Sequence, residues 1–219
     1  MTGGPRVALI SATTAAMRPA EEALITEIPE VEPWHLLDDR LLTDAEANGG
    51  VGDELRARME RLIRYAISGG AAAVLLTCSQ FGAATAAFHP RSASNGVPVL
   101  GSDESAFAEV VALAPRRLLV LASLASAAED TTCRISQAMA GAGLICEVDA
   151  RIGEIQAEGD LLGADPNLGD SAGSYDAILL AQYSLAPAAS GLRTLGIPVF
   201  SGPAAAAAVL RQRLGGRSR

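Results

Sequence analysis

The sequence predicts an α/β fold made of two similar halves, each with a parallel β-sheet. Short apolar runs that end in small polar residues alternate with segments whose apolar residues recur at helical spacing. The chain also repeats itself: GAAAVLLTCS at 70–79 and GVPVLGS at 96–102 match YDAILLAQYS at 175–184 and GIPVFSG at 196–202. Two copies of one strand-rich segment indicate two copies of one α/β unit.

The repeat places the boundary between the halves near residue 101. We expect an N-terminal half at 1–101 and a C-terminal half at 102–201. Pro203 suits the first turn of a last helix, and we expect the segment 203–219 to pack back onto the N-terminal half. The chain has 219 residues, of which 49% are hydrophobic and 4% aromatic, so it can bury a large, mainly aliphatic core.

Each element of the N-terminal half follows from a local pattern. A helix is expected over 18–28, where Pro29 ends it. A second helix over 53–68 has apolar residues on one face, and Gly69 and Gly70 stop it. The expected strands are the short apolar runs at 7–11, 34–37, 72–77 and 97–100.

The C-terminal half shows the same alternation. Ser102 is the expected N-cap of a helix that runs to Leu113, with Asp103 and Glu104 in its first turn, where the helix dipole favours carboxylates. The segment 156–174 is polar and rich in glycine, which predicts a loop or a short helix. The other expected elements are strands at 118–122, 144–148, 177–181 and 198–200, and helices at 127–140 and 203–214.

Charge and hydropathy exclude several classes of protein. The net charge of -8 argues against nucleic acid or an anionic membrane as the main partner. No apolar run reaches the roughly 18 residues of a membrane helix, and the N-terminal apolar stretch is too short for a signal peptide. We therefore expect a cytoplasmic protein with no membrane partner. Its three cysteines are an odd number without metal spacing, so a disulfide framework is not expected.

The chain contains no lysine, which excludes two classes of catalytic or nucleotide-binding site. A pyridoxal-phosphate enzyme needs a lysine amine for its Schiff base, and a Walker P-loop needs its lysine. The two histidines, His35 and His89, belong to no HExxH pattern, and there is no CxxC pair, so no metal site is expected. We expect any catalysis to run without a cofactor.

Small polar side chains and one thiol follow the expected strands. In open α/β sheets, ligands bind beyond the carboxyl ends of the strands. Cys78 stands in the first copy of the repeat where the second copy has Gln182. Backbone N–H groups at the start of a helix after Cys78 would bind a carboxylate and favour the reactive thiolate. The candidate site residues are Ser11, Thr13, Thr77, Cys78, Ser79, Ser123, Gln182 and Ser184.

The remaining cysteines and histidines have simpler interpretations. Cys133 lies in an expected helix and Cys146 in an expected strand, and we interpret both as structural. Neither His35 nor His89 shows a pattern that predicts a partner, and we interpret His89 as a surface or capping residue.

Three motifs give the chain a family resemblance. The sequence LLTCS at 75–79, the GVPV and GIPV strands, and the opening VALISATTAAMRPAEEAL at 7–24 resemble the aspartate/glutamate racemase superfamily. That superfamily includes glutamate, aspartate and hydantoin racemases, maleate isomerase and arylmalonate decarboxylase. The resemblance implies two Rossmann/flavodoxin-like halves related by pseudo-two-fold symmetry, with the site in the cleft between them. It also suggests a homo-oligomer.

The resemblance assigns chemistry to the repeat. In the racemases, two cysteines flank the substrate's α-carbon, one removing its proton and the other returning it on the opposite face. Cys78 matches the first cysteine, whereas Gln182 takes the place of the second and is neither an acid nor a base near neutral pH. Ser184 lies two residues further on, but an unassisted hydroxyl is a poor proton donor. Arylmalonate decarboxylase has the opposite arrangement, because it keeps only the second cysteine and lacks the first.

We therefore expect a cofactor-independent racemase or isomerase that acts on a small carboxylate, with Cys78 as its single catalytic thiol. Gln182 and Ser184 would complete the catalytic set. A decarboxylase of a malonate-type acid is the alternative reaction. A catalytically degenerate carboxylate-binding protein is the alternative of another class. In each case the expected carboxylate-binding residues are Ser11, Thr13, Thr77, Ser79 and Ser123.

Overall fold

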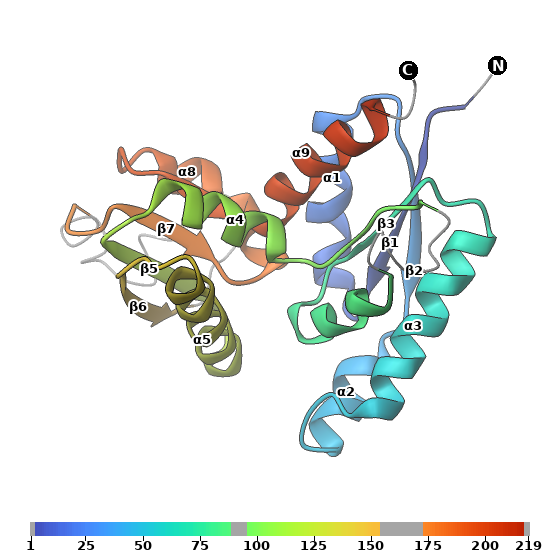
Figure 1. Ribbon diagram of the computed structural model, residues 1–219, viewed down its shortest axis with the longest axis horizontal. Helices are drawn as coiled ribbons and strands as arrows, with labels where there is room; N and C mark the ends of the chain where they lie inside the picture. Colours follow the sequence, from blue (N-terminus) through green and yellow to red (C-terminus); the bar gives the residue numbers. More distant parts are fainter. Residues whose placement is uncertain (1–2, 89–95, 154–172, 217–219) are drawn as a thin grey trace. The chain divides into compact units, whose positions relative to one another are not determined.

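The computed structural model describes residues 3–88, 96–153 and 173–216 and contains two four-stranded parallel sheets with helices (Figure 1). The chain divides into two compact units. The first unit comprises Met1–Glu104 and Ala206–Arg219, and the second comprises Ser105–Ala205. The prediction of an α/β fold in two similar halves is confirmed. In the described ranges, no helix is both long and apolar enough to cross a membrane.

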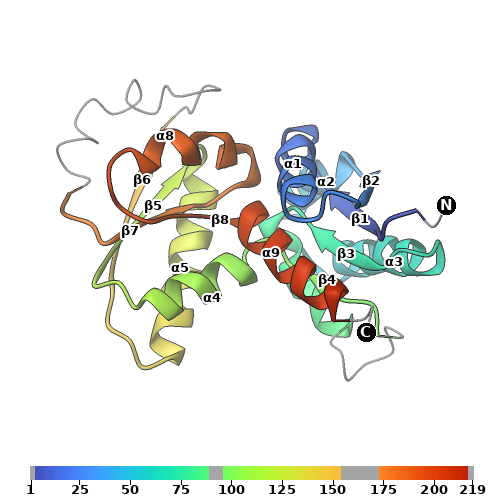
Figure 2. The same ribbon diagram turned by 90° about the horizontal axis from the view of Figure 1, so that it is seen from above.

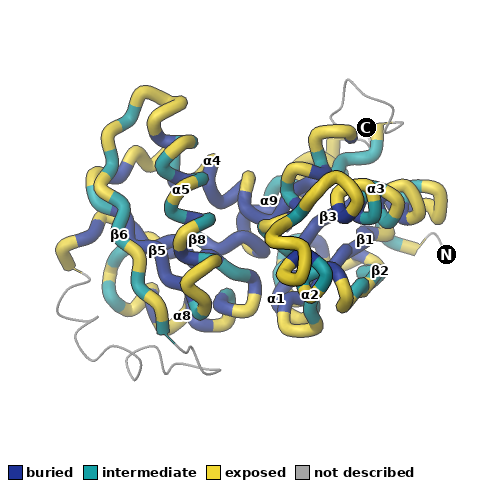
Figure 3. The backbone as a smooth tube through the Cα atoms, turned by 90° about the horizontal axis from the view of Figure 1, so that it is seen from below, coloured by how far each residue is buried: buried dark blue, intermediate teal, exposed yellow. Residues whose placement is uncertain are grey.

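The sheet of the first unit has the strand order β2-β1-β3-β4, with every neighbouring pair parallel. Its central strands are buried throughout their apolar residues, as Figure 3 shows by colour. This is the pattern of a parallel sheet covered on both faces, and it explains why these strands read as continuous apolar runs. The strands are β1 (Arg6–Ser11), β2 (Glu32–Leu37), β3 (Ala73–Leu76) and β4 (Val99–Leu100).

Helices cover both faces of this sheet. One face packs against α2 (Arg40–Ala47), α3 (Asp53–Ser68) and the 3₁₀ helix η2 (Ser79–Phe88). Beyond β1 the chain forms a short 3₁₀ helix, η1 (Thr14–Ala16), and then α1 (Met17–Glu27). The final helix α9 (Gly202–Gly215) runs beside α1 in Figures 1 and 2, and an ion pair of 3.3 Å joins Arg211 to Glu27.

The sheet of the second unit has the strand order β6-β5-β7-β8, again with every neighbouring pair parallel. One face packs against α4 (Glu104–Leu113) and α5 (Ala125–Gly141). The other face packs against the 3₁₀ helix η3 (Tyr183–Ala188) and α8 (Ala189–Arg193). The strands are β5 (Arg117–Ala122), β6 (Glu147–Ile152), β7 (Ala177–Leu180) and β8 (Val199–Ser201).

The two sheets share one register, which aligns the repeat residue by residue. Ile10 pairs with Leu76 in the first sheet as Leu121 pairs with Leu180 in the second. Beyond these pairs, the Thr77 N–H donates to the Ile10 carbonyl at 3.0 Å, and the Ala181 N–H donates to the Leu121 carbonyl at 2.9 Å. Thr77 is therefore equivalent to Ala181, and the next residue, Cys78, is equivalent to Gln182.

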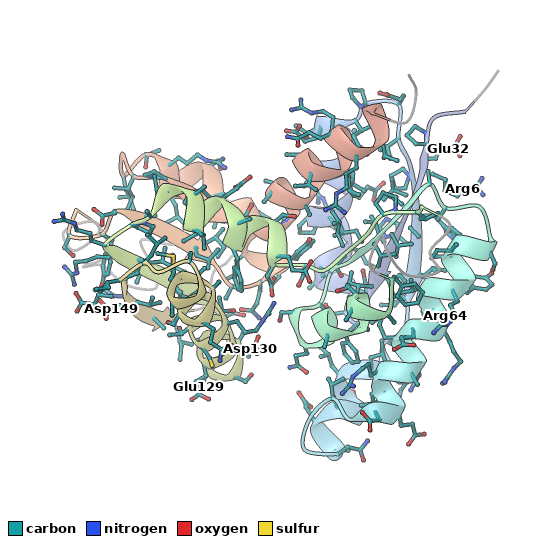
Figure 4. The ribbon with its side chains drawn as sticks, in the orientation of Figure 1. Arg6, Glu32, Arg64, Glu129, Asp130 and Asp149 are labelled. Atoms are coloured by element: carbon teal, nitrogen blue, oxygen red, sulfur yellow. The ribbon has the colours of Figure 1, made fainter. Side chains whose placement is uncertain are left out.

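An exposed ion pair joins the starts of two neighbouring strands in each sheet. Arg6 and Glu32, labelled in Figure 4, begin the paired strands β1 and β2 and lie 3.6 Å apart. Arg117 makes the corresponding contact in the second unit, 3.1 Å from Glu147 at the start of β6. Such exposed pairs contribute little stability, about 0–1 kcal/mol each.

Several expected boundaries differ from the structure by two or three residues. The strands expected at 34–37 and 97–100 are Glu32–Leu37 and Val99–Leu100, and the helix expected at 127–140 is Ala125–Gly141. The sixth strand begins at Glu147 rather than at residue 144, because Gly143 adopts a left-handed φ of 72° and turns the chain. Ile145 is 96% exposed after this turn. The fourth helix begins at Glu104, so Ser102 is not its N-cap.

Several short elements were not expected at all. The sequence predicts no helix over 40–47, but this segment forms α2, and Arg58 of α3 makes an ion pair with its Asp44. The helices η3 and α8 also follow β7 without a clear sequence signal. Most of the segment 156–174, expected to be a loop or short helix, lies outside the described residues, as does His89.

Asp176 caps the start of β5 in the second unit, which makes stability depend on pH. Its Oδ2 accepts the backbone N–H groups of Arg116 and Arg117 at 2.7 and 2.9 Å. These hydrogen bonds, chiefly that from Arg117, lower the pKa of the Asp176 carboxyl. A lowered pKa stabilises the fold above the unfolded-state pKa of about 4, and the contribution is lost as the pH falls through the folded-state pKa.

We predict that Asp176→Asn lowers the free energy of unfolding at neutral pH. The deficit relative to wild type should stay constant from pH 7 to about pH 5 and shrink below about pH 4, as the wild-type carboxyl is protonated. Urea denaturation across this pH range measures both proteins. A deficit that does not change with pH would show that the carboxylate charge is not what stabilises this turn.

Candidate functional site

Cys78 lies just beyond the carboxyl end of β3, two residues after Leu76. Its side chain is half-buried and packs against the apolar cluster between the sheet and the helices α2, α3 and η2. Its carbonyl accepts the Phe81 N–H at 3.3 Å, which fixes the first turn of η2. The thiol is thus held at a strand end, with part of its surface open to solvent.

Thr77 and Ser11 meet directly beneath this strand end. The Thr77 hydroxyl lies 3.0 Å from Ser11 Oγ and can donate to it, or donate to the Ile10 carbonyl at 3.5 Å. Ser11 has 0% and Thr77 5% of its surface exposed. Ser11 is therefore better placed to orient Thr77 than to contact a ligand itself, which refines its expected role.

Thr13 and Ser79 lie on the loops that leave the same edge of the first sheet. Thr13 is extended, precedes η1 and is half-exposed, and its side chain does not cap the helix. Ser79 is half-exposed and begins η2. The expected helix after Cys78 is thus a 3₁₀ helix, whose hydrogen bonds join residues three apart, rather than an α-helix.

A charged network that the sequence does not predict braces this edge. The Asp38 N–H donates to the Ser11 carbonyl at 3.0 Å, directly after β2. Arg58, from α3, donates to Asp38 at 2.6 Å and to Asp44 of α2 at 2.8 Å. Asp38 and Asp44 lie 20 and 14 positions from Arg58, so no helical spacing reveals the contacts. The network ties α2, α3 and the end of β2 together.

In the second unit, the structure brings Gln182 and Ser123 together at the carboxyl edge. Gln182 Oε1 accepts the Ser123 backbone N–H at 2.8 Å and lies 3.0 Å from the Ser123 hydroxyl. The Gln182 carbonyl accepts the Leu185 N–H at 3.1 Å, as the Cys78 carbonyl accepts the Phe81 N–H. Ser184 is exposed on η3.

Each unit has a hydrogen-bonded pair of polar side chains at its carboxyl edge. In the second unit this pair lies one residue further along the chain than in the first. The shared register makes Ser11 equivalent to Ala122, so the Ser11–Thr77 pair has two alanines, Ala122 and Ala181, as its counterpart. The Ser123–Gln182 pair instead occupies the positions of Ala12 and Cys78. The thiol and the amide therefore sit at equivalent positions with different polar neighbours.

The other cysteines lie away from the carboxyl edges. Cys133 is exposed on α5, where Gln137 Nε2 donates to its sulfur at 3.2 Å. Cys146 precedes β6 at the opposite edge of the sheet, and burial raises the pKa of its thiol. His35 does have a partner, contrary to expectation: its Nε2 lies 3.2 Å from Glu21 of α1.

Acidic, histidine and cysteine side chains do not gather into a metal site in the part of the chain that the structure describes. No group of three or more of them there is close enough to hold an ion.

No protein-family profile matches the chain, and no curated protein sequence is significantly similar to it. Solved structures do share its fold. The aspartate racemase of Picrophilus torridus has a TM-score of 0.65 at 14% identity, covering 97% of this chain and 95% of its own. Allantoin racemase from Klebsiella pneumoniae has a TM-score of 0.61 at 17% identity, covering 98% and 89%.

An arylmalonate decarboxylase structure has a TM-score of 0.66 at 20% identity, covering 97% of this chain and 93% of its own. The glutamate racemase of Francisella tularensis, solved with D-glutamate, has a TM-score of 0.61 at 11% identity. These structures span nearly the whole of this chain, so the similarity extends over both units. The resemblance drawn from the motifs is confirmed at the level of the fold.

Proposed function

We propose that this chain is a cofactor-independent racemase or isomerase that acts on a small carboxylate, with Cys78 as its single catalytic thiol. The observation that carries the proposal is the position of Cys78, half-exposed at the carboxyl end of a central parallel strand, where ligands of open α/β sheets bind. The fold shared with racemases of aspartate, glutamate and allantoin supports the same reading.

Gln182 stands at the position equivalent to Cys78, and this limits the mechanisms by which the substrate could be racemised. Two-base racemisation needs an acid or base on each face of the α-carbon, and an amide supplies neither near neutral pH. Cys78 would then act as one base, with water or a substrate group exchanging the proton on the other face. In an isomerisation, its thiolate would add to a double bond, allow rotation and leave again.

The carboxylate would be bound mainly from the first unit. Thr13 and Ser79 have exposed surface at the edge that carries Cys78, and both hydroxyls can donate to a carboxylate oxygen. Ser11 would contribute by orienting Thr77. Ser184, exposed on η3, would supply a further hydroxyl in the second unit.

Decarboxylation of a malonate-type acid is the second candidate reaction. The specific observation in its favour is the presence of one thiol rather than two at the equivalent positions, because protonating an enolate after loss of carbon dioxide requires a single proton donor. Arylmalonate decarboxylase also shares the fold.

Incubation in deuterated water distinguishes these reactions. Suitable substrates are aspartate, glutamate, allantoin, maleate and an arylmalonate, followed by NMR. Racemisation should place deuterium on the α-carbon of recovered substrate, and decarboxylation should release carbon dioxide and label only the product. Isomerisation through thiol addition should convert maleate without labelling it.

Two further outcomes bear on the proposal as a whole. If no compound turns over but dicarboxylates still protect Cys78 from alkylation, the chain is a carboxylate-binding protein rather than an enzyme. If there is neither turnover nor protection, the proposal is wrong.

A further inference from the structure

We infer that Gln182 is a hydrogen-bond donor held in one orientation by Ser123, and that it binds a carboxylate, carbonyl or enolate oxygen of the substrate. This inference rests on the proposed function and makes its recognition chemistry more specific. Gln182 would then determine specificity, and Ser123 would be a positioning residue that acts through it.

The geometry fixes which end of the amide is available. Gln182 Oε1 receives two donors from one residue, the Ser123 N–H at 2.8 Å and the Ser123 hydroxyl at 3.0 Å. A carbonyl oxygen has two lone pairs, so this oxygen is fully used. Turning the amide over would set its NH₂ group against the Ser123 N–H, two donors with no acceptor between them, and only the Ser123 hydroxyl could adapt, by accepting instead of donating. The amide nitrogen is therefore the end that can meet a ligand.

That nitrogen has two N–H donors, and none of the residues that the structure describes accepts a hydrogen bond from it. The Gln182 side chain is half-exposed, so the donors can reach a ligand without unfolding. At the equivalent position of the first unit, Cys78 has Ala12 in the place of Ser123, and no side-chain hydroxyl is available there. The equivalent residues of the first unit, Ala12 and Cys78, therefore cannot form the pair of hydrogen bonds that Ser123 makes to Gln182 (the Ser123–Gln182 lock).

A neutral amide donor recognises oxygen and not an ammonium group. It cannot accept a hydrogen bond while Ser123 occupies its carbonyl oxygen. The substrate group bound there would thus be a carboxylate, a carbonyl or the oxygen of an enolate. In an enolate the developing charge would strengthen the hydrogen bond, which stabilises the intermediate without an acid or base at this position.

The test measures malonate binding to the intact protein by titration calorimetry. Gln182→Met removes the donors, and Gln182→Glu replaces them with a negative charge that the same Ser123 donors would hold. We expect malonate affinity to fall roughly ten- to hundredfold in Gln182→Met and further in Gln182→Glu. Gln137→Glu adds the same charge at an exposed position of the same unit and should bind malonate like wild type.

Ser123→Ala tests the lock itself through a double-mutant cycle. It should weaken malonate binding in the wild-type background, because only the backbone N–H at position 123 then holds the amide, but have no effect in the Gln182→Met background. A purely structural role of Ser123 would instead weaken binding equally in both. Thermal unfolding verifies that each variant is folded.

A further measurement observes Gln182 in the wild-type protein, without any substitution at the site. In wild-type protein labelled with nitrogen-15, the side-chain amide signals of Gln182 should shift when malonate is added, whereas those of Gln137 should not. The Gln182→Met spectrum assigns the signals.

The outcomes separate the inference from the proposed function. If wild-type protein does not bind malonate and no dicarboxylate protects Cys78, the proposed function fails and this inference fails with it. If wild-type protein binds malonate, but both Gln182 variants bind within twofold of it and the amide signals do not move, only this inference is wrong.

Discussion

Replacing Cys78 with alanine should reduce turnover by about a hundred- to ten-thousandfold, the contribution expected of a positioned acid or base. The loss should appear in kcat more than in KM, because the thiol acts on the reacting carbon while other groups bind the carboxylate. Cys78→Ser should be similarly impaired, since a hydroxyl gives up its proton far less readily than a thiol. The assay is the deuterium-exchange reaction that the wild-type protein catalyses.

Cys133→Ala is the matched control for this experiment. Cys133 is an exposed thiol on α5, away from the carboxyl edge of the second sheet, so its loss should leave turnover unchanged. Iodoacetamide should correspondingly inactivate wild-type protein and the Cys133→Ala variant at the same rate. Full turnover in Cys78→Ala would rule out the proposed mechanism.

Truncating Phe81 to alanine should cost about 3–5 kcal/mol of stability, the range for a fully buried phenylalanine. Its ring is 1% exposed within the apolar cluster of the first unit. Its N–H also donates to the Cys78 carbonyl, so a collapsing cavity would loosen the turn that holds the thiol. We expect a lower free energy of unfolding in urea and a changed rate of Cys78 alkylation.

Leu185→Ala is the counterpart in the second unit. Leu185 is 2% exposed, and its N–H donates to the Gln182 carbonyl at the equivalent turn. It should lose about 2–5 kcal/mol of stability yet leave the rate of Cys78 alkylation in folded protein as it is. Phe81→Leu should retain most of the stability of wild type. If Phe81→Ala proved as stable as wild type, the ring could not be part of the core.

Much of the fold is already determined by local sequence patterns. The helix over 53–68 was predicted with its observed ends, because apolar residues on one face and the following glycines are local signals. The central strands β1, β3, β5 and β7 were predicted to within one residue at each end, since a strand buried on both faces must be a short apolar run.

The sequence alone also determined that Cys78 and Gln182 hold equivalent positions, because the repeat preserves the spacing of its strands and turns. The hydrogen bonds of the two sheets reproduce this alignment. This equivalence is the most specific information about the site that the sequence alone provides.

Tertiary structure decided what each of those side chains can do. Ser11 and Thr13 looked alike as polar residues after β1, but only the packed unit buries Ser11 under Thr77 and leaves Thr13 half-exposed. Ser123 and Gln182 are 59 positions apart and Arg58 and Asp38 are 20 apart, so their hydrogen bonds exist only once the sheet sets its register. Spacing along the chain reveals a residue's place on a strand or helix, whereas its partner depends on which elements pack beside it.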